Sequence, residues 1–202
     1  MRIKAYNLIV LALVIITGMV SPKVLADSGT GEEYQVKAAF LYNFIKFIDW
    51  PREKMADSND IITIGIIGKD PFGKAFEPIE NKQVKGRDVI IKRFKGLKQL
   101  EDSKEKNKSA LNQQIEEMKK CHLLFICRSE KQKLKEILNI VKDYHVLTVA
   151  DTEGSLEAGN IIEFVMVERK VRFEINMVAT KQAKLKIRSQ LLRLAEKIIE
   201  EE

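Results

Sequence analysis

The segment Gly68–Ala75 is the part of the chain that most resembles a catalytic motif. It reads GKDPFGKA, follows an apolar run and matches the G-x-x-x-x-G-K pattern of phosphate-binding loops. In such loops a Ser or Thr after the lysine binds magnesium, and backbone N–H groups surround the phosphates. Here Ala75 replaces that hydroxyl residue, and Pro71 removes one N–H group. These departures argue against nucleotide hydrolysis.

The same region is a better candidate for binding a small anion or metabolite. Predicted strands end just before Lys69–Asp70, Arg128–Ser129 and Asp151, and ligands of open α/β sheets bind beyond the carboxyl ends of the strands. The candidate ligand-binding residues at these strand ends are Lys69, Asp70, Arg128, Ser129 and Asp151. Lys69, Arg128 and the free N–H groups of two predicted helix starts could hold a carboxylate or phosphate. The alternative interpretation is that Asp70, Ser129 and Asp151 only form caps and turns.

The two cysteines, Cys121 and Cys127, lie in one apolar segment, CHLLFIC. If this segment is a strand, the two residues are about 20 Å apart, whereas a disulfide needs Cα atoms within about 7 Å. We therefore expect no bond between them. They are either small buried hydrophobic residues or redox sites that form an intermolecular bridge or a reactive thiol. Cys127 is the better redox candidate because it precedes a predicted helix.

No other group of residues indicates catalysis. His122 lies inside the same apolar segment and is expected to be a hydrogen-bonded core residue, and His145 lies in a predicted loop. Neither has a second His, Cys or acid at the spacing of metal ligands, and no G-x-S-x-G motif occurs. The sequence predicts no enzyme, no metal and no cofactor.

The first 26 residues have the layout of a secretory signal peptide. Arg2 and Lys4 precede the apolar run Leu8–Ile16, and Val24-Leu25-Ala26 supplies small residues before a cleavage point. A retained transmembrane anchor is the alternative, but the apolar core from residue 8 to residue 20 is shorter than the roughly 20 residues that a span needs. We expect cleavage after Ala26 and a periplasmic domain over 27–202.

Charge and composition exclude several classes of protein. The chain has 202 residues, 45% hydrophobic and 32% charged, which is typical of a globular domain and not of a disordered or collagen-like chain. Its formal charge of +6 falls to +3 without residues 1–26. No basic footprint for nucleic acid remains.

An aromatic helix is predicted over Glu32–Asp49, ending before Pro51. Six of the 14 aromatic residues of the chain lie between residues 34 and 50. A helix that is apolar nearly all round must be buried on more than one side. It is either a core helix or a helix with one face against a partner. The candidate partner-binding residues are Tyr34, Tyr42 and Trp50.

The rest of the chain alternates between strands and helices. Strands are predicted at 61–67, 89–94, 121–127 and 146–150. Three helices are predicted between them: one at 71–79, one that ends near residue 120, and one at 129–141. A hairpin follows at 161–167 and 170–175. From residue 176 a helical tail is predicted, with the apolar stripe Ile187, Leu191, Leu194 and Ile198. This order predicts a single-domain α/β fold: a doubly wound, mostly parallel sheet flanked by helices, with a C-terminal antiparallel hairpin and helix.

Five ordered blocks resemble the YfiR-like family of exported bacterial proteins. The first is EYQVKAAFLYNFIKFIDWP at 33–51. The others are IGIIGKDPFG at 64–73, CHLLFI with RSE at 121–130, VLTVAD at 146–151, and the hairpin over 159–176; the tail at 185–195 also agrees. The resemblance covers essentially the whole chain after residue 26.

The resemblance implies a periplasmic α/β domain without known catalysis, often a homodimer. In the namesake system the protein represses a membrane diguanylate cyclase by binding its periplasmic sensory domain, and an outer-membrane lipoprotein relieves the repression, so cyclic di-GMP output follows. Two departures stand out: the family's frequent first-strand cysteine, which can face the one matching Cys121, is absent from Ile61–Ile67, and Lys184 replaces a frequent Gly.

Two functions follow as expectations. The first is a periplasmic, non-enzymatic regulator that binds and represses a membrane signalling protein. The second is a small-ligand sensor or carrier that uses the carboxyl edge of the sheet. Nucleic acid is not expected as a partner.

Overall fold

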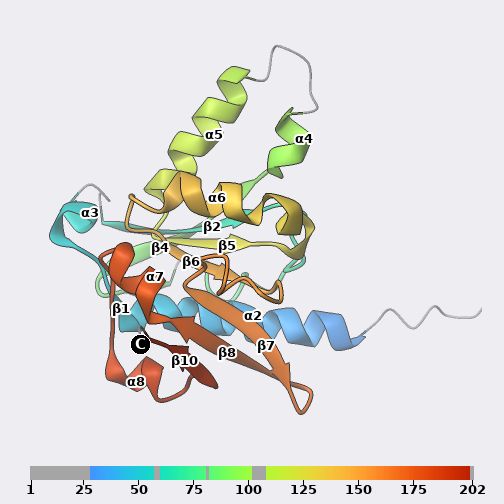
Figure 1. Cartoon of the computed structure of the whole chain (residues 1–202), viewed down its shortest axis with the longest axis vertical. Helices are drawn as coiled ribbons and strands as arrows, with labels where there is room; N and C mark the ends of the chain where they lie inside the picture. The colour runs from blue at the N-terminus through green and yellow to red at the C-terminus, as the bar shows by residue number, and fades with distance from the viewer. Residues whose placement is uncertain (1–27, 57–59, 81, 102–107, 201–202) are drawn as a thin grey trace, which may run out of the picture.

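The computed structural model describes residues 28–56, 60–80, 82–101 and 108–200, and it consists of one large sheet with helices on both faces (Figure 1). The predicted signal peptide lies outside the described residues. The sheet has eight strands. In spatial order they are β10 (Lys197–Ile199), β8 (Lys170–Asn176), β7 (Ile162–Val167), β6 (Leu147–Ala150), β5 (Leu123–Ile126), β2 (Ile61–Ile67), β4 (Arg87–Phe94) and β3 (Gln83–Val84).

Most of the sheet is parallel, which confirms the predicted fold class. Strands β4, β2, β5, β6 and β7 are parallel neighbours. The hairpin partner β8 is antiparallel to β7, the short β3 is antiparallel to β4, and β10 is parallel to β8. The chain passes from β2 outward to β4 and then returns to β5 on the other side of β2. The topological switch point therefore lies between the carboxyl ends of β2 and β5.

Helix α2 (Ser28–Phe47) covers one face of the sheet. Its residues Leu41, Phe44 and Ile45 are fully buried against side chains from alternate positions of the strands. The Phe44 ring lies 5.7 Å from the ring of Phe164 and 5.0 Å from that of Phe173. Burial of aromatic rings of this size is among the largest stabilising contributions a core can have. The aromatic helix is thus a core helix on this side.

Three helices cover the opposite face (Figure 1): α4 (Leu97–Glu101), α5 (Lys108–Lys120) and α6 (Leu134–Val141). Successive residues of a strand face opposite sides of the sheet, so these helices form a second hydrophobic core with the residues that do not face α2. In β5, for example, Phe125 faces α2, whereas Leu124 and Ile126 belong to the second core. Strands buried on both faces read as continuous apolar runs, as observed for β5. Helix α4 is an element that the sequence did not predict.

Two predicted helix starts are wrong. Residues 71–79 form a series of turns, in which Asp70 Oδ1 accepts a hydrogen bond from the Phe72 N–H group at 2.7 Å. Ser129 does not cap a helix: it lies in the 3₁₀ helix η3 (Arg128–Lys133), which precedes α6 and has no side-chain cap. Instead, Ser129 Oγ accepts a hydrogen bond from the backbone of Lys69. An Asx turn or a 3₁₀ turn satisfies these backbone groups as well as an α-helix would.

The predicted helical tail is also wrong. It consists of α7 (Met177–Gln182), β9 (Lys186–Ile187), α8 (Ser189–Leu192) and β10. Lys184 has a φ of 56°, a left-handed conformation that ends a helix. After it, β9 pairs with β1 (Ile48–Asp49), and β10 joins β8. Leu194, a member of the predicted stripe, is 61% exposed. The apolar spacing indicated a helix, but part of this segment pairs with strands that are distant in sequence.

Candidate functional site

A crevice of about 540 Å³ opens at the carboxyl edge of the sheet. One wall comes from α2, through Glu33 and Lys37. The second comes from the segments that follow β5 and β6, and the third comes from β7. We call this hollow the crevice. Its volume is typical of a small-ligand site. It lies beside the ends of β5 and β6, two of the three strand ends from which the sequence predicted a binding site, and not beside the end of β2.

The floor of the crevice is a buried ion cluster centred on Lys37. The side chain of Lys37 is 2% exposed, and its Nζ lies 2.6 Å from Glu33 Oε1 and 3.0 Å from Asp151 Oδ2. The hydroxyl of Tyr34 donates to the same Asp151 oxygen at 2.7 Å. Burial, and then the hydrogen bond to Asp151, raise the pKa of Tyr34 above its ordinary value, so its hydroxyl remains a donor. A buried ammonium is tolerated only when paired in this way.

Two polar atoms beside this cluster lack partners. Asp151 Oδ1 and Thr152 Oγ1 are buried, and neither makes a hydrogen bond within the described part of the chain. Both residues line the crevice. An unsatisfied buried carboxylate oxygen is costly, and native proteins usually give such an atom a partner. These two atoms are therefore the unsatisfied hydrogen-bonding groups of the crevice wall.

The neighbouring carboxylate of Glu163 is satisfied internally. It accepts hydrogen bonds from the N–H groups of Ser155 and Leu156 and from the Ser155 hydroxyl, at 2.8, 3.1 and 2.8 Å. These contacts close the loop after β6 over the first residues of β7. Glu163 thus holds the wall of the crevice in place and has little capacity left for a ligand.

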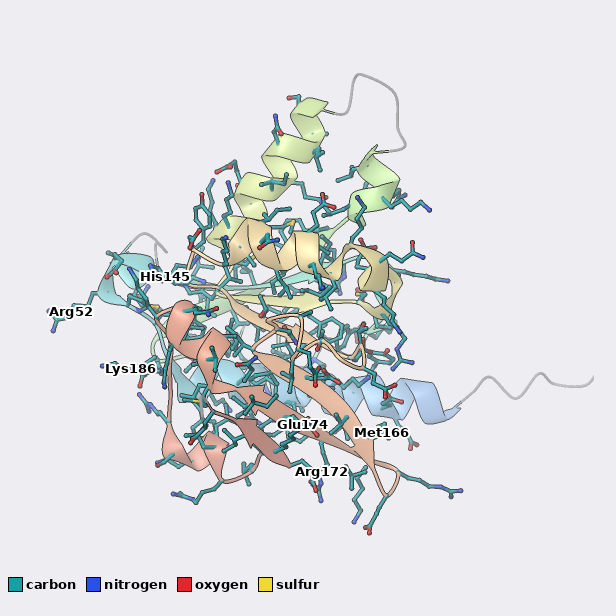
Figure 2. All side chains as sticks on the ribbon, viewed as in Figure 1. Arg52, His145, Met166, Arg172, Glu174 and Lys186 are labelled. Carbon is teal, nitrogen blue, oxygen red and sulfur yellow. The ribbon has the colours of Figure 1, made fainter. Side chains whose placement is uncertain are left out.

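The rim of the crevice is positively charged on one side. Arg128 and Lys131 are exposed and line it. The Arg128 guanidinium donates through Nη2 to the carbonyl oxygen of Asp151 at 3.1 Å, which fixes the side chain beside the floor cluster. Met166, on the opposite side, projects from the β7–β8 hairpin and is 53% exposed (Figure 2).

The structure divides the five predicted ligand-binding residues into two groups. Arg128 and Asp151 line the crevice. Lys69, Asp70 and Ser129 do not. The backbone N–H of Lys69 is bonded to Ser129, and Asp70 Oδ2 accepts from the Arg93 guanidinium at 2.7 Å. For Asp70, the interpretation as a turn residue fits the observed contacts.

Glu130 explains why no anion site forms at the switch point itself. This buried side chain accepts a hydrogen bond from the Leu97 N–H group at 3.0 Å. It lies so close to two glycines that a Cβ on Gly68 would come within 2.8 Å of its Cγ. A Cβ on Gly96 would come still closer to its Oε1. The loop that resembles a phosphate-binding motif is therefore filled by a carboxylate.

Sequence reasoning missed Glu33, Lys37 and Thr152 as site residues. Lys37 lies in the middle of an otherwise apolar helical stretch, one turn after Glu33, and that isolated charge was the available signal. Its partner Asp151 is 114 residues away, so only the fold brings the two charges together.

The three predicted partner-binding residues have different environments. Tyr34 belongs to the floor cluster of the crevice. Trp50 is buried at 8% exposure and donates from Nε1 to the carbonyl oxygen of His122 at 3.2 Å, so its assignment to a docking surface is wrong. Tyr42 is half-buried, and its ring lies 4.1 Å from the Lys46 ammonium. Of the three, Tyr42 is therefore the residue that remains at the surface, where its hydroxyl donates to the carbonyl oxygen of Gln83 at 3.4 Å.

Both cysteines are free and buried. Burial raises the pKa of Cys121 to about 12 and also raises the pKa of Cys127. The thiolate form, which is the reactive one, is therefore suppressed at neutral pH. This environment favours the structural interpretation of the two residues over the redox one.

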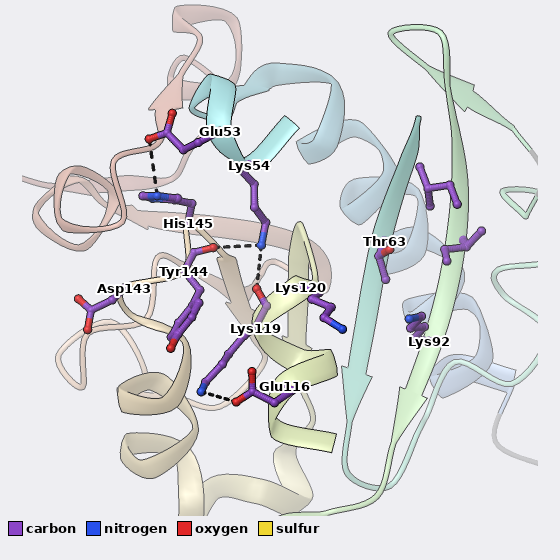
Figure 3. A pocket seen from close by; sticks show the side chains of 12 residues that line it. Glu53, Lys54, Thr63, Lys92, Glu116, Lys119, Lys120, Asp143, Tyr144 and His145 are labelled. Atoms are coloured by element: carbon purple, nitrogen blue, oxygen red, sulfur yellow. Dashed lines mark hydrogen bonds and ion pairs between the residues drawn. The ribbon is translucent and has the colours of Figure 1, made fainter. Parts of the chain in front are cut away.

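A second hollow, of about 480 Å³, lies at the opposite, amino edge of the sheet (Figure 3). Its lysines already have protein partners. Lys54 Nζ donates to the carbonyl oxygens of Lys119 and Tyr144 at 2.8 and 3.0 Å, and Lys119 pairs with Glu116 at 2.7 Å. His145 Nε2 is 3.9 Å from Glu53. These contacts join α3 (Arg52–Ala56) to the ends of α5 and α6, which is a structural role.

His122, near this edge, is a core residue as expected, although only one of its ring nitrogens has a partner. Nδ1 accepts a hydrogen bond from the Thr63 N–H group at 3.1 Å, whereas Nε2 has none among the described residues. Burial, and then the charges of Lys54 and Arg87, lower its pKa to about 4, so the ring is neutral near pH 7. Within 28–56, 60–80, 82–101 and 108–200, no group of three His, Cys, Asp or Glu residues could hold a metal ion.

The fold and the site define an α/β domain with a ligand-sized crevice at the carboxyl edge of its sheet. The chain belongs to the YfiR/HmsC-like family, whose family model matches residues 34–196. Membership in this family implies a periplasmic regulator, and the family is regulatory, not catalytic. Among curated proteins, none matches the sequence. None of the helices in the described ranges is long and apolar enough to cross a membrane.

Two solved structures have the same fold at very low sequence identity. One is a conserved domain protein from Vibrio cholerae, with a TM-score of 0.50, 8% identity, and coverage of 82% of this chain and 60% of that one. The other is an ABC domain from Streptococcus pneumonia in complex with L-Trp, with a TM-score of 0.51, 8% identity, and coverage of 83% and 60%. The chain thus spans about three fifths of the length of these proteins, and the likeness concerns the fold alone.

Proposed function

We propose that this protein is a periplasmic, non-enzymatic regulator that binds and represses a membrane signalling protein through the periplasmic sensory domain of that partner. A diguanylate cyclase, or a similar membrane sensor, is the proposed partner. The observation that supports this function is the family match over residues 34–196. Relief of repression by an outer-membrane lipoprotein and a homodimeric state belong to the same proposal.

The surface proposed for docking is the outer face of α2. It consists of the exposed or half-buried residues Gln35, Val36, Ala39, Tyr42, Asn43 and Lys46. Among them, Tyr42 also packs against the core, and its hydroxyl donates to the carbonyl oxygen of Gln83 in β3 at 3.4 Å. Lys46 carries the only charge among these six side chains, and Val36 is 44% exposed. Depletion of charge and presence of an aromatic residue are typical of the central part of protein interfaces. Figure 1 places this helix at the surface, with α4, α5 and α6 on the opposite side of the sheet.

The test is a pull-down from detergent-solubilised envelope membranes with the purified chain that begins at residue 27. We expect recovery of a membrane protein with a periplasmic domain. Val36→Asp places a charge on the outer face of α2 and should abolish that recovery. The matched control, Asn139→Asp, places the same charge on the exposed face of α6 and should have no effect. Recovery of no membrane protein, or equal recovery with Val36→Asp, would count against the proposal.

Small-ligand binding is the second candidate function. The observation that favours it is the unpartnered Asp151 Oδ1 at the floor of a ligand-sized crevice. A regulator can also sense a ligand if the ligand binds more tightly to one state of the regulator, free or partner-bound, than to the other. Ligand binding then changes the affinity for the membrane partner by the same factor. The two candidate functions are therefore compatible in one protein.

A further inference from the structure

We propose that the amino edge of the sheet carries a cationic surface that holds this protein on a membrane of anionic phospholipids. This surface, which we call the cationic end, consists of six exposed basic residues from three segments of the chain: Arg52, Lys82, Lys85, Lys184, Lys186 and Arg188. The proposal goes beyond the proposed function, because it concerns the lipid and not the membrane protein that the regulator binds.

Contacts distant in sequence bring the three segments together. Lys186 is the partner of Asp49 in the β1–β9 ladder. The Arg188 guanidinium donates to both carboxylate oxygens of Asp49, at 3.0 Å from Nε and 2.9 Å from Nη2. Lys85 Nζ donates to the same carboxylate at 2.8 Å. Arg52 is the first residue of α3, three positions after Asp49, and Figure 2 shows it on the same side of the molecule as Lys186.

The cationic end has few acids to balance its charge. Three acidic residues lie beside it through contacts or through neighbourhood in sequence or strand pairing: Asp49, Glu53 and Asp88. The cations therefore outnumber the acids two to one. Arg52, Lys184 and Lys186 make no ion pair within the part of the chain that the structure describes. Their charges are thus available to an anionic surface.

Asp49 fixes two of the cations without neutralising both. The hydrogen bond from Arg188, and then that from Lys85, lower the pKa of Asp49 to about 2 against the opposing effect of burial. Asp49 is therefore ionised at neutral pH. The side chains of Arg188 and Lys85 remain 47% and 33% exposed. One carboxylate between two cations leaves a net positive charge, which this pairing holds at the surface.

An anionic lipid surface fits the cationic end better than an acidic protein does. Four of its six residues are lysines, and lysine is depleted at protein–protein interfaces. Ordering each long lysine side chain against a rigid partner costs conformational entropy. Lipid headgroups can rearrange around the cations, so a matched geometry is not required. The negative surface potential of such a membrane strengthens binding by about fivefold for each Lys or Arg near it.

The position of the cationic end leaves the other proposed surfaces free. Strands β2 and β5 run away from this end, and α2 finishes at it (Figure 1), where the Phe47 carbonyl oxygen accepts from the Arg188 N–H group at 3.0 Å. The crevice lies at the opposite edge of the sheet. A membrane under the cationic end would leave the outer face of α2 open to the periplasmic domain of a neighbouring membrane protein.

The test is sedimentation of the chain that begins at residue 27 with vesicles of two compositions. One is phosphatidylcholine alone, and the other contains about one third phosphatidylglycerol. We expect binding to the anionic vesicles to be at least tenfold tighter than binding to the neutral ones. Raising the salt concentration from about 0.05 M to about 0.5 M should remove this preference, since salt screens exposed charges.

A triple variant locates the surface. Arg52→Gln, Lys82→Gln and Lys186→Gln remove one exposed charge from each of the three segments. Together they should weaken binding to the anionic vesicles by roughly a hundredfold, from about fivefold for each charge. The melting temperature should match that of the unmodified protein, because surface changes of this kind have little effect on stability.

The matched control removes three exposed lysine charges outside the cationic end: Lys69→Gln, Lys74→Gln and Lys135→Gln. It lowers the net charge of the protein by the same amount, and it should weaken binding by less than about threefold. The proposal is overturned if the protein does not prefer anionic vesicles, or if the two triple variants lose affinity equally.

The pull-down from detergent extracts separates this proposal from the proposed function. The Arg52→Gln/Lys82→Gln/Lys186→Gln variant should still recover the membrane protein, since its docking surface is the outer face of α2. Loss of that recovery, without binding of the unmodified protein to anionic vesicles, would show that the cationic end docks on an acidic protein and would overturn the lipid. Vesicle binding without recovery of any membrane protein would support the lipid and count against the regulator alone.

Discussion

The ammonium of Lys37 lies 3.0 Å from Oδ2 of Asp151, and the two residues are 114 positions apart in the sequence. This buried contact joins α2 to the end of β6 across the edge of the sheet. Together with the contact to Glu33 at 2.6 Å, it compensates the buried charge of Lys37.

Replacing Lys37 should destabilise the protein strongly. Lys37→Met leaves Asp151 as a buried charge without its main partner, which typically costs about 3–5 kcal/mol. We expect the double variant Lys37→Met/Asp151→Asn to recover part of this loss, because the charge that remains, on Glu33, is on a side chain that is 26% exposed. Urea denaturation followed by circular dichroism measures both values. Equal stability of Lys37→Met and the unmodified protein would contradict the assignment of the cluster.

Stability should fall between pH 7 and pH 5 because of His122. Its pKa is about 4 in the folded protein and about 6.5 in an unfolded chain, so below pH 6.5 the unfolded state binds a proton that the folded state does not. The contribution is fully present above pH 6.5 and is lost as the pH falls toward 4; at pH 5 the loss is about 2 kcal/mol.

The control for this pH dependence is His122→Gln, which removes the titrating ring. The difference in unfolding free energy between pH 7 and pH 5 should shrink by most of that amount in the variant. If His122→Gln shows the same pH dependence as the unmodified protein, other groups are responsible.

Gly96→Ala should destabilise the protein through Glu130. The added Cβ would overlap the Glu130 carboxylate, and forced repacking in a filled site costs about 1–3 kcal/mol. In a Glu130→Ala background the same change should cost much less, since the obstructing atoms are gone. Urea denaturation of the unmodified protein, the two single variants and the double variant measures the unfolding free energies. If Gly96→Ala lowers the unfolding free energy equally with and without the Glu130 side chain, the contact with Glu130 does not explain why residue 96 is glycine.

Tyr42→Ala should weaken association with the membrane partner by at least tenfold. Tyrosine is among the residues whose truncation at an interface costs about 2 kcal/mol or more, and Tyr42 is only half-buried in the free protein. Its melting temperature should fall only slightly. Tyr144→Ala, a change at an exposed tyrosine on the amino edge, is the matched control. Binding is measured by surface plasmon resonance with the partner recovered in the pull-down.

Cys121 and Cys127 should be unreactive in the folded protein. Both thiols are buried, and the pKa of Cys121 is about 12. Iodoacetamide at pH 8 should modify neither residue within an hour, and both should react in 6 M guanidinium chloride, as read by mass spectrometry. Modification of Cys127 under native conditions would restore it as a redox candidate.

Local sequence patterns predicted most of the sheet. The β-branched run at 61–67 and the alternating segments on either side of Glu168-Arg169 formed the expected strands, because burial on one or both faces dictates such patterns. The prediction of a helical tail from residue 176 was wrong because contacts distant in sequence determine its structure. Its apolar residues have helical spacing, but their backbone groups pair with β1 and β8, and distant strands leave no local signal.

The candidate site was predicted in part for a similar reason. Strand ends identified Arg128 and Asp151, since the carboxyl edge of a parallel sheet can be read from the strand order. The role of Lys37 depends on a contact between α2 and that edge, which the helical pattern does not reveal. Nor could the sequence show that Glu130 fills the space beside Gly68 and Gly96.

The tail closes the molecule last. The Arg188 guanidinium bonds to Asp49 at 2.9 and 3.0 Å across 139 positions, and β10 supplies one border of the sheet from the final residues described. A chain that emerges amino end first therefore cannot complete this border until β10 has been synthesised. Until then β8 presents an open edge, the kind of surface on which chaperones act.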